Sequence, residues 1–183
     1  MFFGPSPFLS HPMRLFFANK PSFEVRLAIA EMGQGLIAAH GLQGHVMDAG
    51  RLHLTLAAAW AEHLSLQEAI WRAQNLAIEI RGAACLACFD VTGSFRSGDR
   101  FPFVLRGEGM TGLADFRAYL RRRMQRAGFA VASGFMPHMT LIWADRRVED
   151  NPIAPISWPI EDFELVLSAG GDHIQLGRWP LTW

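Results

Sequence analysis

Apolar residues recur along the chain at two spacings, which predicts a mixture of strands and helices. Short apolar runs bounded by Gly, Pro and Ser predict strands at 14–18, 51–57, 84–92, 100–106, 137–143, 163–168 and 173–176. Longer segments predict helices over 23–32, 66–80 and 113–127. Ser22 and Ser65 are suited to cap the first two helices, and Gly128 is suited to end the third. The pattern therefore predicts strands and helices that alternate along the chain.

No linker in this pattern is long or polar enough to separate two domains. We therefore expect a single bilobal domain over residues 13–183, preceded by an extension at residues 1–12 that lies outside the core.

Composition limits the classes of function. Half of the 183 residues are hydrophobic and 19% are charged, as in a folded globular protein. The net charge is zero, which argues against a protein that binds long nucleic acid mainly by charge but leaves a short anionic substrate open. No apolar run reaches the roughly 18 to 20 residues of a membrane span, and the prolines near the start do not fit a secretory signal. We expect a cytoplasmic monomer without membrane contact.

One tetrapeptide occurs twice, as His-Leu-Thr-Leu at 53–56 and as His-Met-Thr-Leu at 138–141, although the chain has only seven His and five Thr. A strand sends residues i and i+2 to one face and residue i+1 to the other. The His and Thr of each copy would then share a face, with the apolar residues turned toward a core. That face presents an imidazole, which exchanges a proton near neutral pH, beside a hydroxyl that can donate a hydrogen bond to an anion.

Each copy of the motif follows an early strand and a helix, which predicts two similar lobes facing each other across a groove. Two imidazoles would then flank one pocket. His53 and His138 are the candidate catalytic residues, one as a general base and the other, protonated, as a general acid. Thr55 and Thr140 are the candidates for holding a charged group between them.

Further segments in a fixed order give the chain a family resemblance. These are Arg-Leu-Phe-Phe-Ala at 14–18, the motifs with their flanks at 52–56 and 128–141, Pro-Ile-Ser-Trp at 155–158, Phe-Glu-Leu-Val at 163–166 and Trp-Pro-Leu at 179–181. Over about residues 13–181 the sequence resembles the two-histidine phosphoesterase superfamily. Within it, the chain is most similar to the RNA 2′,3′-cyclic phosphodiesterases, also called 2′-5′ RNA ligases.

The resemblance implies a bilobal α+β fold in which two antiparallel sheets with pseudo-twofold symmetry line a central cleft, with the helices outside. It also implies opening of a terminal 2′,3′-cyclic phosphate of RNA to a 2′-phosphate without a metal or cofactor, and RNA joining as the reverse class of reaction. In this chemistry His53 and His138 move protons, while Thr55 and Thr140 hydrogen-bond the non-bridging oxygens. Arg14 is a further candidate for binding phosphate.

Some positions depart from the family pattern and leave the substrate open. Trp143 follows the second motif where members often have a nearby Arg, and His173 stands where a late Tyr is common. A small cyclic nucleotide is therefore an alternative to an RNA 3′ end. A noncatalytic module that binds an RNA end or a nucleotide is the alternative from another class.

Other motifs favour structural interpretations. Cys85 and Cys88 have the C-x-x-C spacing without a second pair, so we expect two buried reduced thiols. The glycines of 107–112 match a dinucleotide fingerprint but follow half of a predicted hairpin, so we expect a turn into a helix. We expect Arg117 and the four later Arg of that helix on a solvated face. Two His without a run of acidic or Cys residues nearby make a poor metal site.

Overall fold

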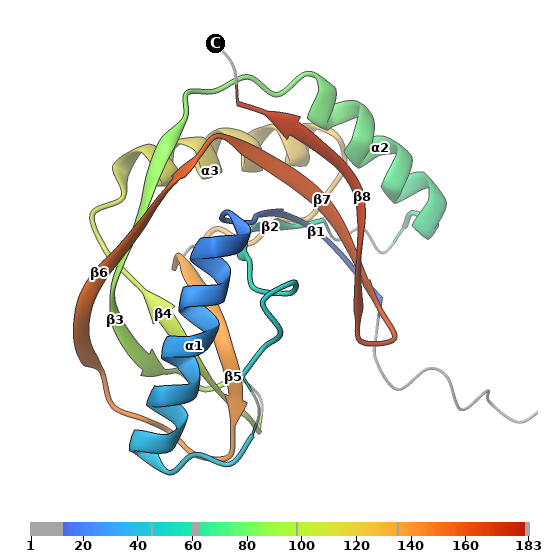
Figure 1. Ribbon diagram of the computed structural model, residues 1–183. Helices are drawn as coiled ribbons and strands as arrows, with labels where there is room; N and C mark the ends of the chain where they lie inside the picture. The colour runs from blue at the N-terminus through green and yellow to red at the C-terminus, as the bar shows by residue number, and fades with distance from the viewer. Residues whose placement is uncertain (1–12, 45, 60–62, 98, 135, 182–183) are drawn as a thin grey trace, which may run out of the picture.

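Figure 1 shows the computed structural model, which describes residues 13–44, 46–59, 63–97, 99–134 and 136–181. The strands are β1 (Arg14–Asn19), β2 (Leu54–Ala58), β3 (Cys85–Ser94), β4 (Phe101–Arg106), β5 (His138–Ala144), β6 (Asn151–Ile160), β7 (Asp162–Ala169) and β8 (Asp172–Pro180). The helices are α1 (Phe23–His40), α2 (Leu66–Ile78) and α3 (Thr111–Arg126). The predicted extension at residues 1–12 lies outside the described residues. No helix in the described part of the chain is long and apolar enough to cross a membrane.

The strands form two four-stranded antiparallel sheets, in the orders β2-β1-β7-β8 and β5-β4-β3-β6. Both motif strands, β2 and β5, are edge strands of their sheets. Each pairs with the strand that precedes it in the chain, across a helix: β1-α1-β2 in one sheet and β4-α3-β5 in the other. This confirms the predicted α+β fold and its internal repetition.

One face of each sheet is buried in a single apolar core. Phe17 and Leu54 of one sheet, and Leu105 and Leu141 of the other, are fully buried members of one cluster of contacting side chains. Helix α2 packs against β8, and α3 packs against β2 and β3. Figure 1 shows both helices on the outer side of the arch formed by β7 and β8. We call the opposite face of each sheet, which carries the His and Thr of its motif, the motif face.

Helix α1 is longer than the sequence predicted. It continues past residue 32 to His40, because isolated glycines such as Gly33 and Gly35 weaken a helix without ending it. It ends at Gly41, whose φ of 57° is left-handed and whose N–H reaches the carbonyl of Ala38.

Strand β6 was not predicted, because Pro152, Pro155 and Pro159 lie within it. A proline has no N–H to donate to a neighbouring strand, so it is tolerated where one side of the strand is unpaired. Strand β6 is such an edge strand, since only β3 pairs with it. Strand β8 also extends past the predicted 173–176, to Pro180.

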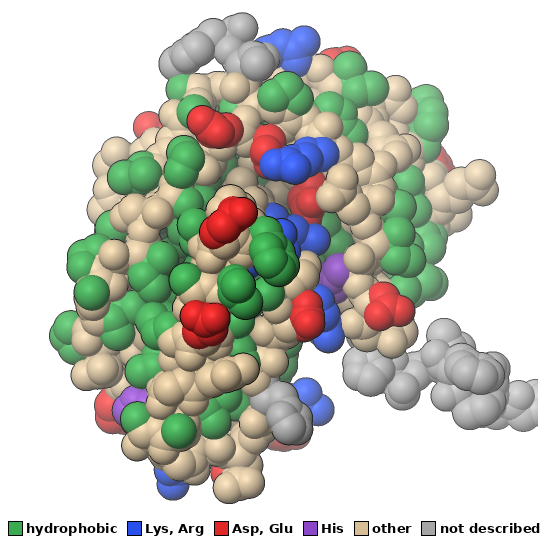
Figure 2. All heavy atoms as spheres, viewed as in Figure 1, with side chains coloured by type: hydrophobic (Ala, Val, Ile, Leu, Met, Phe, Trp, Pro, Cys, Tyr) green, Lys and Arg blue, Asp and Glu red, His purple; other side chains and the backbone are tan. Residues whose placement is uncertain are grey.

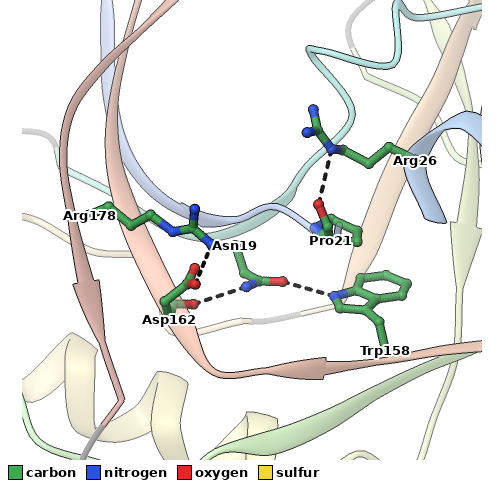
Figure 3. Close-up of polar contacts among 6 residues, drawn as sticks. All are labelled: Asn19, Pro21, Arg26, Trp158, Asp162 and Arg178. Atoms are coloured by element: carbon green, nitrogen blue, oxygen red, sulfur yellow. Dashed lines mark hydrogen bonds and ion pairs between the residues drawn. The ribbon is translucent and has the colours of Figure 1, made fainter. Parts of the chain in front are cut away.

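The chain crosses from one sheet to the other where β6 leads into β7. Hydrogen bonds connect this crossing to the end of β1 (Figure 3). The indole Nε1 of Trp158 donates to the Asn19 side-chain oxygen at 2.9 Å, and the Asn19 amide donates to the Asp162 carbonyl at 2.9 Å. Asn19 and Trp158 are almost fully buried. The two sheets are thus joined by the chain itself and by a satisfied buried polar group.

Candidate active site

Each of the two motif histidines is oriented by a hydrogen bond of the same kind. The Nδ1 of His53 lies 2.6 Å from the carbonyl oxygen of Arg51, and the Nδ1 of His138 lies 2.8 Å from that of Met136. A carbonyl oxygen can only accept, so each Nδ1 carries a hydrogen and donates it. In the neutral form this leaves Nε2 of each ring as the nitrogen that can accept a proton.

The alternation predicted for both motifs is present. Leu54 and Met139 are fully buried, whereas Thr55 and Thr140 are partly exposed on the motif faces. Each hydroxyl therefore lies on the same face as the imidazole two residues earlier.

A one-residue bulge follows the Thr in each motif strand. Pairing passes from Ala18↔Thr55 to Phe17↔Ala57, which leaves Leu56 unpaired in β2. In β5, pairing passes from Val104↔Thr140 to Phe103↔Ile142, which leaves Leu141 unpaired. The final Leu of each motif is thus the bulged residue, and it is buried together with the residue after it.

The two motifs lie close together although they belong to different sheets. Strands β2 and β5 are in contact. The positive charge of a protonated His138 is one of the influences that lower the pKa of His53. Both imidazoles thus lie within electrostatic range of each other.

Rings surround His53. The ring of Phe16 stacks on it with centroids 5.1 Å apart, and the ring of His173 meets it edge-on at 5.0 Å. Phe16 belongs to a small buried cluster with Ala18 and Val166, separate from the main core and on the motif face. This cluster forms an apolar surface beside the first motif.

Burial lowers the pKa of His53 to about 4, and the positive charges of His173, Lys20 and His138 act in the same direction. The hydrogen bond to Arg51 opposes the shift. Because an ordinary His titrates near 6.5, His53 is neutral throughout the physiological range. A neutral imidazole with a hydrogen on Nδ1 can take a proton at Nε2.

His138 has a more open setting. It is half-buried, and the ring of Phe95 meets it edge-on with centroids 5.2 Å apart. The segment that leads to His138 is held by Arg117, which donates to the carbonyls of Ala132 at 2.6 Å and Ser133 at 3.2 Å.

Sequence reasoning missed an ion pair beside the first motif. Lys20 follows Asn19, which pairs with Leu54, so Lys20 and His53 lie at the same end of the β1–β2 ladder. The Lys20 ammonium lies 3.0 Å from Oε1 of Glu164, and both side chains are largely buried. A buried Glu on the motif face is chemically unusual, but nothing in a single sequence separates it from surface carboxylates.

His173 was left undecided by the sequence, and the structure places it at the first motif, against His53 and Phe16. Its Nδ1 is buried without a hydrogen-bond partner in the described part of the chain. Burial lowers the pKa of His173, and the charges of Arg51 and Lys20 add to this effect.

Arg14, the predicted phosphate candidate, is exposed at the start of β1. It precedes Phe16 by two residues and therefore lies on the motif face, where it pairs with Ser168, the partner of His173. Its role stays a prediction.

A recess of about 410 Å³ adjoins this region where β1 leads into α1. Its lining includes Lys20, Glu164 and Gln175, together with Arg178 and Asp162, which form an ion pair (Figure 3). Figure 2 shows charged side chains of both signs around a hollow on this face. Two of its cations, Lys20 and Arg178, are already paired with carboxylates, so the recess offers little free positive charge to an anion.

The remaining motifs have structural roles, with two corrections. Cys85 and Cys88 are free thiols, but they are half-buried and not buried as expected. Arg117 is only 6% exposed, so it does not belong to the solvated face predicted for the Arg residues of α3. Gly107 and Gly109 lie in the predicted turn between β4, which is half of a hairpin with β3, and α3, and Gly112 is the second residue of α3. Among the described residues, no cluster of three His, Cys, Asp or Glu could hold a metal ion.

Comparison with solved structures supports the resemblance. A phosphoesterase crystal structure matches with a TM-score of 0.75 and 26% identity, over 94% of this chain and 100% of the other. Escherichia coli LigT in complex with 3′-AMP matches with a TM-score of 0.72 and 27% identity, over 94% and 100%. TT0787 of Thermus thermophilus shares the fold with a TM-score of 0.67 and 24% identity, over 92% and 97%.

No family model and no curated protein sequence matches the chain. The likeness is therefore carried by the structure. It confirms the resemblance to the two-histidine phosphoesterase superfamily and the LigT-like fold, and it supports a phosphoesterase or ligase type of activity.

Proposed function

We propose that the protein is a phosphodiesterase that opens the terminal 2′,3′-cyclic phosphate of an RNA 3′ end to a 2′-phosphate without a metal or cofactor. The observation that carries this proposal is the matched pair of imidazoles. Each donates from Nδ1 to the carbonyl two residues earlier, and each has a Thr hydroxyl two residues later on the same face.

In the proposed reaction a water oxygen attacks phosphorus, and the bond between phosphorus and the 3′ oxygen breaks. One imidazole takes the proton of the water, and the other gives a proton to the departing 3′ oxygen. The products are a 2′-phosphate and a 3′-hydroxyl. With a 5′-hydroxyl attacking phosphorus in place of water, the same steps in the same direction would join two RNA ends through a 2′-5′ bond.

We assign the base to His53 and the acid to His138. The lowered pKa of His53 keeps its Nε2 free to accept a proton. The role of acid then falls to His138, the second imidazole of the matched pair. Thr55 and Thr140 would donate hydrogen bonds to the non-bridging oxygens, where negative charge grows in the transition state.

A small cyclic nucleotide is the second candidate substrate. Escherichia coli LigT has been solved with 3′-AMP, which shows that a LigT-like fold accepts a single nucleotide. A noncatalytic nucleotide-binding module is the third possibility, and the same experiment separates all three.

The experiment is a turnover assay after treatment with a chelator, on an oligonucleotide and on a nucleoside that both end in a 2′,3′-cyclic phosphate. We expect His53→Ala and His138→Ala each to lower kcat by roughly 10² to 10⁴, the usual contribution of a general acid or base. His63→Ala is the matched control, because His63 is an exposed residue outside both motifs.

Three results would change the proposal. Unchanged turnover in both variants would refute the two-histidine mechanism. Loss of turnover on chelation alone would refute its independence of metal. Binding without any turnover by the wild type would favour the noncatalytic module.

A further inference from the structure

An exposed tryptophan lies on the motif face next to the second motif. Trp143 is 41% exposed, although it stands within β5, three residues after Thr140. The bulge at Leu141 explains its orientation. It places Leu141 and Ile142 in the core one after the other, and it thereby returns Trp143 to the face of Thr140.

The corresponding position of the first motif strand carries no such ring. Ala58 follows the bulge of β2 as Trp143 follows that of β5, and it is a small exposed residue. The two otherwise similar motif strands thus differ at this point. At this position a large apolar side chain is exposed on β5 and not on β2.

Trp143 also has a cationic neighbour. The guanidinium carbon of Arg100, just before β4, lies 6.0 Å from the centroid of the indole ring. Arg100 forms no ion pair within the described part of the chain, so its charge is available to a phosphate. An exposed aromatic ring beside a guanidinium group is the combination by which proteins bind single-stranded nucleic acid, since every base has a face that stacks.

We propose that Trp143, with Arg100, forms a stacking site for a base of the RNA strand that leads to the cyclic phosphate. This inference rests on the proposed function and names its substrate as an oligonucleotide. Three residues along a strand place Trp143 roughly 10 Å from Thr140. The ring is therefore placed for a nucleotide upstream of the phosphate held by the motifs.

The charge of the chain supports this means of binding. Net charge is zero, so attraction to phosphates alone gives little affinity for RNA. Stacking adds affinity without net charge and without base specificity, by roughly 5- to 100-fold for each base. One such site would let the protein prefer RNA ends over single nucleotides.

The test compares a nucleoside 2′,3′-cyclic phosphate with a tetranucleotide that ends in the same group. We expect wild type to have the higher kcat/KM on the tetranucleotide. The preference is the ratio of the two kcat/KM values. In Trp143→Ala this ratio should fall about tenfold, because KM for the tetranucleotide rises. Trp143→Phe should keep most of it, since a phenyl ring still stacks. Trp71→Ala is the matched control, because Trp71 is 63% exposed on α2, away from both motif strands.

A binding measurement separates this inference from the proposed function. Fluorescence anisotropy of a labelled tetranucleotide with a 2′-phosphate end reports affinity without turnover, and Trp143→Ala should weaken it while Trp71→Ala should not. An unchanged preference and affinity in Trp143→Ala would overturn the inference, as would an equal loss on both substrates. If wild type turns over neither substrate, the proposed function fails while the affinities still decide the role of Trp143.

Discussion

His53 and His138 share one orientation but differ in their surroundings. Each donates from Nδ1 to a carbonyl two residues earlier. His53 is enclosed by Phe16 and His173, whereas His138 contacts the edge of one ring, that of Phe95. This difference is the basis of the proposed roles, His53 as base and His138 as acid, because burial disfavours the charged form of an imidazole.

The pH dependence of turnover tests this assignment. If His53 is the base, the free enzyme is active only when this imidazole is neutral. The value of kcat/KM should then rise with pH around the pKa of about 4 that burial gives His53, and not around the ordinary value near 6.5. Lys20→Gln should move this acidic limb to higher pH, because it removes a positive charge that lowers the pKa of His53.

Stability offers a second measurement of the same group. The unfolded chain binds a proton at His53 more tightly than the folded protein does, so the free energy of unfolding should rise with pH between about 4 and roughly 6.5. His53→Asn should reduce that slope in urea unfolding. An acidic limb near 6.5 and an unaltered slope would contradict the lowered pKa.

At the scale of residues, the sequence alone predicts the four motif side chains and the faces they occupy, because alternation along a strand is a local rule. It does not predict Lys20, Glu164 or His173. Glu164 and His173 are brought to the first motif because β7 and β8 join the sheet of β1, which is far from both in the chain. Lys20 lies at the end of β1, beside β2. The catalytic roles of the motif residues stay predictions until the assays are done.

At the scale of elements, glycines show which turns depend on close packing. A Cβ on Gly107 would lie 2.1 Å from the Cys88 carbonyl oxygen, whereas a Cβ on Gly35, within α1, would meet no atom within 4 Å. The turn between β4 and α3 therefore requires glycine for space, and the middle of α1 does not.

Paired substitutions test this reading by chemical unfolding. We expect Gly107→Ala to lower the free energy of unfolding by about 1 to 3 kcal/mol or more, because the clash is with backbone. Gly35→Ala should raise it by about 0.5 to 1 kcal/mol, since alanine favours a helix. Equal effects of the two changes would mean that the close approach at Gly107 is not required.

Elements with a regular pattern could be predicted, and irregular ones could not. Strands β1, β2, β5 and β7 appear where apolar runs placed them. Strand β6 was missed because its prolines are excluded from central strands, and edge position is a property of the sheet and not of the segment. The bulges at Leu56 and Leu141 were missed for a similar reason, since a bulge exists only relative to the partner strand.

For the molecule as a whole, the shared core predicts cooperative unfolding. Leu54 and Leu105 are fully buried in different sheets but in one cluster. Residues 13–183 should therefore behave as one domain in spite of their two lobes.

Thermal unfolding followed by circular dichroism and by tryptophan fluorescence should give one coincident transition. Leu54→Ala and Leu105→Ala should each shift that transition as a whole, with a loss of about 2 to 5 kcal/mol. Two separable transitions, each sensitive to one substitution, would show instead that the lobes fold independently. The cytoplasmic location and the monomeric state stay predictions.

The passage from β6 to β7 has a consequence for motion during catalysis. Only Glu161 separates Ile160, the end of an edge strand in one sheet, from Asp162, the start of an inner strand in the other. Trp158 and Asn19 fasten the same junction. Because this connection is so short, it leaves little room for a hinge between the lobes. We therefore expect the distance between the imidazoles of His53 and His138 to be fixed before substrate binds. Such a catalyst would need no closing step before each turnover, and its rate would be limited by chemistry or by product release.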